Sequence, residues 1–218
     1  MDSIIIGTTD LANQLYFHIK KYKIANVVAF AVNRDYIQND RFLDLPVIDI
    51  ETMEQHYPPN QYNIYIAIGY TQMNQIRQNV YQILKAKGYK FPNFIHPTVK
   101  MDCESIGEAN IVLSNTILDC FVKIGNGNIF HINATISHNS IIGDFNFFAV
   151  RACVCGFVRI GNCCFIGANS TIKNGIIVND NSIIGAGAYL SKDSNKNSVI
   201  VPATSIFLSK TSDSVKLK

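Results

Sequence analysis

The 218-residue sequence lacks the features of a nucleic-acid-binding protein and those of a membrane-spanning one. Its formal net charge is +3 and it has no basic run, which argues against nucleic acid as the main partner. No apolar run approaches the roughly 18 residues that a membrane-spanning helix needs. The first residues show neither the basic segment nor the cleavage site of a secretory signal peptide. We therefore expect a soluble, cytoplasmic protein without a membrane span.

Metal-binding and redox motifs are also missing. The six cysteines include no CxxC pair, and no histidine stands at a spacing that completes a zinc site. The thiols are better interpreted as small hydrophobic side chains, and we expect no metal. Gly7 does not open a GxGxxG fingerprint, so a dinucleotide redox cofactor is poorly supported.

The sequence does contain a six-residue repeat that runs without interruption from residue 106 to residue 189. A helix cannot use this period, because a six-residue step leaves a 3.6-residue helix about 120° off its own face. Hexapeptide repeats are typical of a parallel β-helix, in which each coil buries its inward residues on the coils above and below. The first position of all fourteen hexapeptides is aliphatic or Phe: Ile106, Val112, Leu118, Ile124, Phe130, Ile136, Ile142, Phe148, Val154, Ile160, Ile166, Ile172, Val178 and Ile184.

The segment before the repeat alternates between expected strands and helices. We expect strands at 3–6, 26–32, 46–48 and 62–67, and helices at 10–22, 51–56 and 72–87. This order predicts a small, Rossmann-like α/β domain with a parallel sheet over residues 1–92. The solenoid would occupy residues 93–218, and its hydrophobic segment 199–208 would cap the open end.

Ligands of an open parallel sheet bind beyond the carboxyl ends of its strands. That rule places Gly7, residues 33–36 (Asn33 to Tyr36) and residues 69–71 around one crevice. Arg77 follows in the next expected helix, where its guanidinium could bind a phosphate. A solvated helix charge is the alternative, and the sequence leaves both open.

One histidine of the repeat has a chemically suggestive neighbour. His138 is the third residue of its hexapeptide, and Gly156 is the third residue of the hexapeptide one full coil, or three repeats, further on. The two residues should stack about 4.8 Å apart, as a general base beside a free N–H that can stabilise an oxyanion in acyl transfer. A surface histidine is the alternative. His131 falls outside this column and should face solvent or a neighbouring subunit.

Residues 125–167, with the heptapeptide HNSIIGD at 138–144 in their centre, resemble the left-handed β-helix acyltransferases. More narrowly, they resemble the group that acylates nucleotide-linked amino sugars or sialic acid, and the N-terminal segment is similar to that group's nucleotide-sugar domain. The resemblance implies a left-handed superhelix, against the usual right-handed crossover rule. It also implies a homotrimer with acyl-CoA in the grooves between neighbouring solenoids.

The resemblance also assigns roles to single residues. It makes His138 the base and the Gly156 N–H the partner of the thioester carbonyl. Backbone positions that line CoA would be Ala168 and Ala186, which also stand one full coil apart. Together with Tyr36 of the crevice, the residues expected to bind the nucleotide sugar are Gly7, Asn33, Gly69, Asn74 and Arg77.

Among the departures from the family pattern, two lie in the repeat near the expected site. Asn139 stands where the family has an acidic residue or a second histidine after the base, so the imidazole needs another partner to set its tautomer. Phe147 stands where many relatives carry a histidine that contacts the cofactor.

These observations predict an acyl-CoA-dependent N-acyltransferase, with acetyl as the expected acyl group. Its substrate would be the amino group of a nucleotide-linked amino-deoxysugar, a 4-amino-4,6-dideoxyhexose, used in the synthesis of lipopolysaccharide or another surface glycan. The alternative is an O-acetyltransferase acting on a sugar or on sialic acid. A metal hydratase on the same solenoid would need three histidines where the repeat offers two, and a non-catalytic trimeric scaffold is a further alternative.

Overall fold

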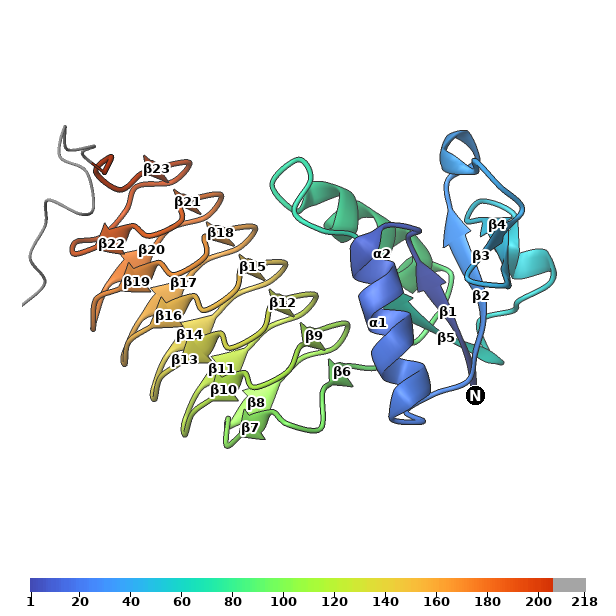
Figure 1. Ribbon diagram of the computed structural model, residues 1–218, viewed down its shortest axis with the longest axis horizontal. Coiled ribbons are helices and arrows are strands. Elements are labelled where there is room, and N and C mark those ends of the chain that lie inside the picture. The colour runs from blue at the N-terminus through green and yellow to red at the C-terminus, as the bar shows by residue number, and fades with distance from the viewer. Residues whose placement is uncertain (206–218) are drawn as a thin grey trace, which may run out of the picture.

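The computed structural model describes residues 1–205, which form a small N-terminal sheet with its helices and a long solenoid (Figure 1). The N-terminal sheet has the strand order β3-β4-β2-β1-β5. Its strands β1 (Asp2–Ile6), β2 (Val27–Val32), β4 (Leu45–Asp49) and β5 (Tyr62–Ile66) are parallel, and β3 (Arg41–Phe42) adds an antiparallel edge. The predicted Rossmann-like arrangement is therefore confirmed.

Two helices cover opposite faces of this sheet. Helix α1 (Asp10–Lys21) packs on the face that carries Ile5, whereas α2 (Gln75–Ala86) packs on the face that carries Ile4 and Ile6. This division follows from the two-residue alternation of side chains along β1. Two short 3-10 helices, η1 (Arg34–Tyr36) and η2 (Met53–Gln55), follow β2 and β4.

Helix α2 begins later than the expected helix at 72–87. Gln72, Met73 and Asn74 have φ angles of 51°, 53° and 66°, and three successive left-handed residues cannot belong to a right-handed helix. They form a turn, closed by the bond from the Asn74 N–H to Tyr70 O, before α2 starts. The loop between β5 and α2 is consequently longer than the sequence suggested.

The solenoid is a left-handed parallel β-helix, as the resemblance implied, and successive strands visit three flat faces in turn. Strands three hexapeptides apart pair with each other, as Ile136 does with Val154, so three hexapeptides make one coil. The first position of each hexapeptide faces inward, and these residues form one continuous apolar core. The prediction that the hexapeptide repeat forms a parallel β-helix with these residues in its core is therefore confirmed.

We number the faces in chain order. Face 1 contains β6 (Phe94–Ile95), β9 (Ile111–Val112), β12 (Ile129–Phe130), β15 (Phe147–Phe148), β18 (Phe165–Ile166), β21 (Ile183–Ile184) and β23 (Val199–Ile200). Face 2 contains β7 (Lys100–Met101), β10 (Ile117–Leu118), β13 (Thr135–Ile136), β16 (Cys153–Val154), β19 (Thr171–Ile172) and β22 (Tyr189–Leu190). Face 3 contains β8 (Ser105–Ile106), β11 (Lys123–Ile124), β14 (Ile141–Ile142), β17 (Arg159–Ile160) and β20 (Ile177–Val178).

The N-terminal part packs against face 1 and against the corner between faces 3 and 1 (Figure 1). Phe91 lies in the core of the N-terminal sheet, and β6 is the first solenoid strand. A domain boundary after residue 92 stays our prediction for this connection. Of the predicted cap at 199–208, β23 adds a last strand to face 1, and residues 206–208 lie outside the described residues.

Asparagine side chains stabilise the corner between faces 3 and 1. Asn110, Asn128 and Asn146 are fully buried and occupy equivalent places in successive coils. The Oδ1 of each accepts the backbone N–H one coil further on, from Asn128, Asn146 and Cys164 in turn. Because buried amides are costly when they lack partners, this ladder makes the corner a rigid platform for the N-terminal part.

Two histidines meet where α1 approaches the first coil. The rings of His18 and His96 are 4.8 Å apart, and Tyr22 packs edge-on against His96 at 4.9 Å. Burial lowers the pKa of His96, and the neighbouring charges of His18 and Lys21 lower it further. Burial and Lys21 likewise lower the pKa of His18. Folding therefore favours the neutral form of both imidazoles.

We expect this pair to make the protein less stable in mild acid. A histidine whose pKa is lowered by folding binds fewer protons in the native state, so stability falls as the pH drops below about 6.5, the unfolded value. The loss is at most about 1.4 kcal/mol per pH unit for each extra proton. Urea unfolding at pH 7.5 and pH 5.5 measures it. In His96→Gln, the free energy of unfolding should differ less between the two pH values. If it falls as much as in the wild type, the histidine pair is not the cause of the acid sensitivity.

Candidate active site

His138 and Gly156 lie together at the corner between faces 2 and 3. His138 follows β13 and Gly156 follows β16, one coil further along. A Cβ atom on Gly156 would lie 2.6 Å from Cε1 and 2.8 Å from Nε2 of His138. The imidazole therefore lies directly over the glycine Cα, and any larger residue at 156 would displace it.

Asn139 orients this imidazole. Its Oδ1 lies 3.0 Å from Nδ1 of His138, and because an amide oxygen only accepts hydrogen bonds, this contact requires the proton on Nδ1. Nε2 is then the unprotonated nitrogen, on the side of Gly156. Phe157 packs edge-on against the ring at 5.2 Å. Asn139 thus sets the tautomer, as an acidic residue would, without adding a negative charge.

The amide of Gly156 is free, unlike those of the preceding residues in its column. The carboxylate of Asp119 accepts the N–H of Cys120 at 2.8 Å and that of His138 at 3.2 Å. These bonds, led by that of Cys120, lower the pKa of Asp119. The Gly156 N–H has no hydrogen-bond partner among residues 1–205. A buried amide without a partner beside a basic nitrogen can receive a developing oxyanion.

Asn174 is a further neighbour, to which the sequence analysis assigned no role. Its Oδ1 lies 3.1 Å from the position that a Cβ on Gly156 would occupy. The signal was present in the spacing, because Asn174 follows Gly156 by three complete hexapeptides.

The predicted CoA-lining residues lie at a different corner. Ala168 follows β18 and Ala186 follows β21, so both stand between faces 1 and 2. Neither backbone N–H is hydrogen-bonded within the described residues. At the third corner, in contrast, the side chains of Asn126, Asp144, Asn162 and Asp180 each accept the equivalent amide of the preceding coil. Face 2 separates Ala168 and Ala186 from His138 within one chain.

The crevice at the carboxyl ends of the N-terminal strands brings four predicted residues together. Gly7, Asn33 and Tyr36 line a cavity of about 220 Å³ with Ile68 and Thr71. Gly69 lines an adjoining cavity of about 430 Å³, which also contains Gly7. Gly7 has a φ of 118°, and a Cβ there would lie 2.8 Å from Ala67 O, so only glycine fits.

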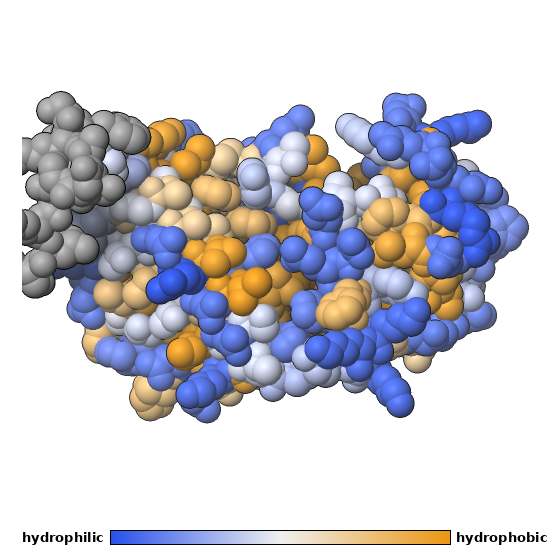
Figure 2. Space-filling view, viewed as in Figure 1, coloured by the Kyte–Doolittle hydropathy of each residue, from blue (hydrophilic) through white to orange (hydrophobic). Residues whose placement is uncertain are grey.

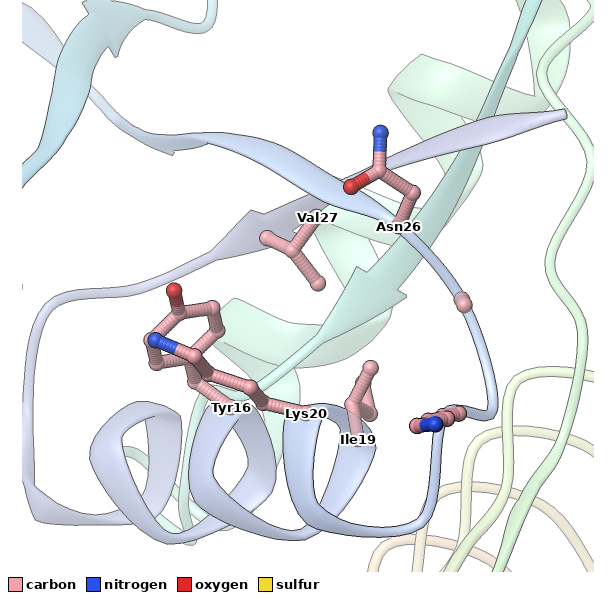
Figure 3. A pocket seen from close by; sticks show the side chains of 7 residues that line it. Tyr16, Ile19, Lys20, Asn26 and Val27 are labelled. Carbon is pink, nitrogen blue, oxygen red and sulfur yellow. The ribbon is translucent and has the colours of Figure 1, made fainter.

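A separate pocket lies at the amino-terminal end of β2, away from the carboxyl ends of the strands (Figure 3). Its volume is about 370 Å³, and Tyr16, Lys20 and Asn26 are among its lining residues. It lies between the end of α1 and the start of β2 and contains none of the predicted site residues. We do not assign it to the site.

Two predicted sugar-binding residues are not in the crevice. Arg77 is 1% exposed and donates hydrogen bonds to five backbone carbonyls, which match the five N–H groups of a guanidinium. Burial lowers its pKa to about 9. Asn74 is fully buried, and its Nδ2 donates to Cys164 O at 3.2 Å. All five N–H groups of Arg77 are bonded to carbonyls, so the structure fits neither of the two roles considered above, a direct phosphate contact or a solvated helix charge. Asn74 joins the loop to the solenoid.

The remaining two positions discussed above lie on the side of face 1. His131 is half-buried at the corner between faces 1 and 2, with its ring 6.0 Å from that of Phe147. Burial lowers the pKa of His131. Phe147 stacks on Phe165 at 5.6 Å, and Tyr70 packs edge-on against both rings. Phe147 thus belongs to an aromatic cluster between the two parts of the chain.

Comparisons with known proteins agree with this architecture. The family model described as "Hexapeptide repeat of succinyl-transferase" matches residues 157–192. The acetyltransferase domain of PglB from Neisseria gonorrhoeae FA1090 is 21% identical, with a TM-score of 0.80 over 91% of this chain and 95% of that one. PerB from Caulobacter crescentus, solved with CoA and GDP-perosamine, is 21% identical with a TM-score of 0.76 over 92% of each chain.

WeeI from Acinetobacter baumannii AYE is also similar, at 18% identity and a TM-score of 0.67 over 87% of this chain and 94% of that one. These likenesses confirm the predicted resemblance at the level of the fold, with both parts of the chain in the same order. Within residues 1–205, no helix is long and apolar enough to cross a membrane. Nor does this part of the chain gather three or more metal-ligating side chains.

Proposed function

We propose that this protein is an acyl-CoA-dependent N-acyltransferase that transfers an acetyl group to the amino group of a nucleotide-linked amino-deoxysugar. The observation that carries the proposal is the pair formed by His138 and Gly156, a free imidazole nitrogen beside a free amide. The likeness to PerB, solved with CoA and GDP-perosamine, supports the substrate classes. A PglB acetyltransferase domain was likewise solved with acetyl coenzyme A. We further propose that the sugar is a 4-amino-4,6-dideoxyhexose and that the reaction serves cytoplasmic synthesis of a surface glycan.

The reaction follows from the geometry of the corner. The sugar amine attacks the thioester carbonyl, the new C–N bond forms, and the C–S bond breaks to release the thiolate of CoA. His138 Nε2 removes a proton from the attacking nitrogen and can deliver it to the leaving sulfur. The Gly156 N–H donates to the oxyanion of the intermediate. General-base assistance contributes roughly 10²–10⁴-fold, and one oxyanion donor contributes about 2.7–4 kcal/mol.

Asn139 favours an amine over a hydroxyl as the nucleophile. Its neutral amide orients the imidazole but supplies no charge to stabilise an imidazolium. A hydroxyl is a poor nucleophile until its proton is removed, whereas a neutral amine attacks through its lone pair. An O-acetyltransferase would need His138 to deprotonate a hydroxyl, and the side chain bonded to the imidazole carries no charge to stabilise the imidazolium that would form.

A mass-spectrometric product assay tests the proposed function. The purified protein would be incubated with acetyl-CoA and a panel of nucleotide 4-amino sugars, their 4-hydroxyl counterparts and sialic acid. We expect acetylation of an amino sugar, and the product should resist hydroxylamine, which cleaves esters and spares amides. Acetylation confined to hydroxyl substrates would support the O-acetyltransferase. A parallel thermal-shift screen should detect a bound ligand, since stabilisation reaches about 2.7 kcal/mol at 100 times its Kd.

The active site needs more than one copy of the chain. The crevice belongs to the part that packs on face 1, whereas His138 lies at the corner opposite that face. The column of Ala168 and Ala186 lies at yet another corner. We propose a homotrimer in which acyl-CoA lies between neighbouring solenoids, so that His138 of one copy faces the corner between faces 1 and 2 of the next.

The surface supports such an assembly. Figure 2 shows hydrophobic side chains exposed over the solenoid among polar ones. Faces 2 and 3 and the corner between them, which the N-terminal part does not cover, carry seven exposed large apolar residues: Met101, Ile117, Phe121, Ile141, Phe157, Ile177 and Tyr189. Clusters of exposed apolar side chains mark interaction surfaces.

We expect sedimentation equilibrium to give three times the chain mass of 24.3 kDa at micromolar concentration. Phe121→Asp combined with Phe157→Asp should lower the mass, because both substitutions place a charge on the uncovered corner. Thr171→Asp, which replaces a half-buried polar side chain of face 2, should lower the mass less than the double substitution. A fully active monomer would contradict the shared-groove arrangement.

A further inference from the structure

Arg77 connects the loop after β5 to the solenoid. Its Nη1 donates to Ile68 O at 3.1 Å and to Gly69 O at 2.7 Å. On the other side, Nε donates to Gly127 O at 2.9 Å, and Nη2 donates to Phe145 O at 3.0 Å. Charge-assisted bonds of this kind are stronger than neutral ones, so the loop is firmly held relative to the solenoid.

The solenoid anchor of Arg77 is the coil that carries His138. Gly127 and Phe145 stand one full coil apart in a single column of the corner between faces 3 and 1, and His138 lies on the turn of chain between them. The same guanidinium therefore sets the place of the crevice loop against the coil that holds the proposed base.

The bonds to Arg77 go together with a defined orientation of the loop amides. The structure contains no cis peptide bond among the described residues, and in a planar trans peptide the N–H points opposite to the C=O. With Ile68 O and Gly69 O directed at Arg77, the N–H groups of Gly69 and Tyr70 point away from it. Neither has a hydrogen-bond partner in residues 1–205, and both residues line the 430 Å³ cavity. Successive amides of this kind form an anion-binding concavity.

We infer that Arg77 is a positioning residue, which directs the Gly69 and Tyr70 amides at an anionic group of the substrate, the diphosphate of a nucleotide-linked sugar. The identity of that anion rests on the function proposed above. Arg77 does not touch the diphosphate, because all five of its N–H groups are already bonded. Its effect on binding passes through the two carbonyls of the loop.

Arg77→Lys separates positioning from charge. Lysine keeps the positive charge, but its single ammonium cannot reach carbonyls on both sides as the guanidinium fork does. Isothermal titration with UDP and GDP, in the absence of acyl-CoA, should show a loss of affinity on the order of tenfold or more for whichever nucleotide binds the wild type, since one bond to a charged group is worth about that factor. The KM of the nucleotide sugar should rise likewise, and that of acetyl-CoA should stay unchanged.

Hydrogen exchange supplies a readout that needs no ligand. The amides of Asn74 and Gln75 are bonded to Tyr70 O and Gln72 O within the loop, so they should exchange faster in Arg77→Lys. The Ala67 amide, bonded to Ile6 O in the sheet, should not change. Gln78→Ala is the matched control, because it removes a side chain of the same helix that contacts Cys163 and keeps the backbone bond from the Gln78 N–H to Asn74 O.

Three results would overturn the inference. Wild-type nucleotide affinity in Arg77→Lys would mean that charge alone suffices, and equal increases in both KM values would mean a general structural role. Unchanged exchange at Asn74 and Gln75 would mean that Arg77 does not order the loop. A wild-type protein that binds UDP or GDP but acetylates no amino sugar would refute the proposed function while leaving the role of Arg77 measurable.

Discussion

His138→Asn is expected to lower kcat by roughly 10²–10⁴-fold, with modest effects on the KM of either substrate. Nε2 of His138 is the basic nitrogen next to Gly156, and Asn139 holds it in the accepting tautomer. An asparagine side chain can occupy much of the same space, but its amide cannot take up the proton of the attacking nitrogen. Steady-state kinetics of amino-sugar acetylation measures the loss.

The fold should survive this substitution. His138 is only half-buried, and its backbone N–H keeps the bond to Asp119, so the thermal midpoint should change little. His56→Asn is the matched control, since His56 is exposed on the N-terminal part, away from both cavities, and kcat should be unaffected. If His138→Asn retains more than a tenth of the wild-type kcat, the general-base assignment is wrong. Proton removal would then fall to water or to the substrate, and positioning with the Gly156 amide would carry the catalysis.

The solenoid could be predicted in detail because its neighbours are encoded at a fixed spacing. Any residue of the repeat lies beside the residue three hexapeptides away, as the pairing of Ile136 with Val154 shows. This rule brought His138 onto Gly156 from the sequence alone. The same rule also places His138 and the predicted CoA-lining residue Ala168 at different corners of the solenoid. The step between them is five hexapeptides, which is not a whole number of coils.

The contacts of Arg77 and Asn74, in contrast, could not be predicted from the spacing of residues in the sequence. Their partners are backbone carbonyls, of Gly127, Phe145 and Cys164 among others, and every residue has a carbonyl whatever its side chain. A buried arginine and a phosphate-binding arginine are therefore alike in sequence. The delayed start of α2 was hidden for a related reason, since Gln72 and Met73 are ordinary helix residues that nevertheless have left-handed φ angles here.

Gly156→Ala is expected to lower kcat by on the order of 10²-fold while leaving the fold intact. The added Cβ would lie 2.6 Å from Cε1 and 2.8 Å from Nε2 of His138, so the imidazole must move away by about an ångström. Displacements of that size cost about 10²-fold when they affect a reacting group. The cost to stability should be small, because the obstructing atoms end a side chain that can rotate toward solvent, and Gly156 does not need a left-handed φ.

Gly175→Ala is the control for an alanine at the same corner. Gly175 has a φ of 75° and nothing within 4 Å of its added Cβ, so this substitution should cost about 1 kcal/mol of stability and leave kcat nearly unchanged. The two substitutions should therefore have opposite effects. Gly156→Ala should lower activity and keep stability, whereas Gly175→Ala should lower stability and keep activity. A Gly156→Ala enzyme with wild-type kcat would show that His138 need not lie over that residue.

The double variant His138→Asn/Gly156→Ala decides how the glycine acts. If the new methyl group works only by displacing the imidazole, then the double variant should be no slower than His138→Asn alone, because the displaced group is already gone. If alanine also moves the free N–H of residue 156 away from the oxyanion, a further loss will remain in the double variant. Since one oxyanion donor is worth about 2.7–4 kcal/mol, that residual loss is large enough to measure, and its size separates the contribution of the amide from that of the base.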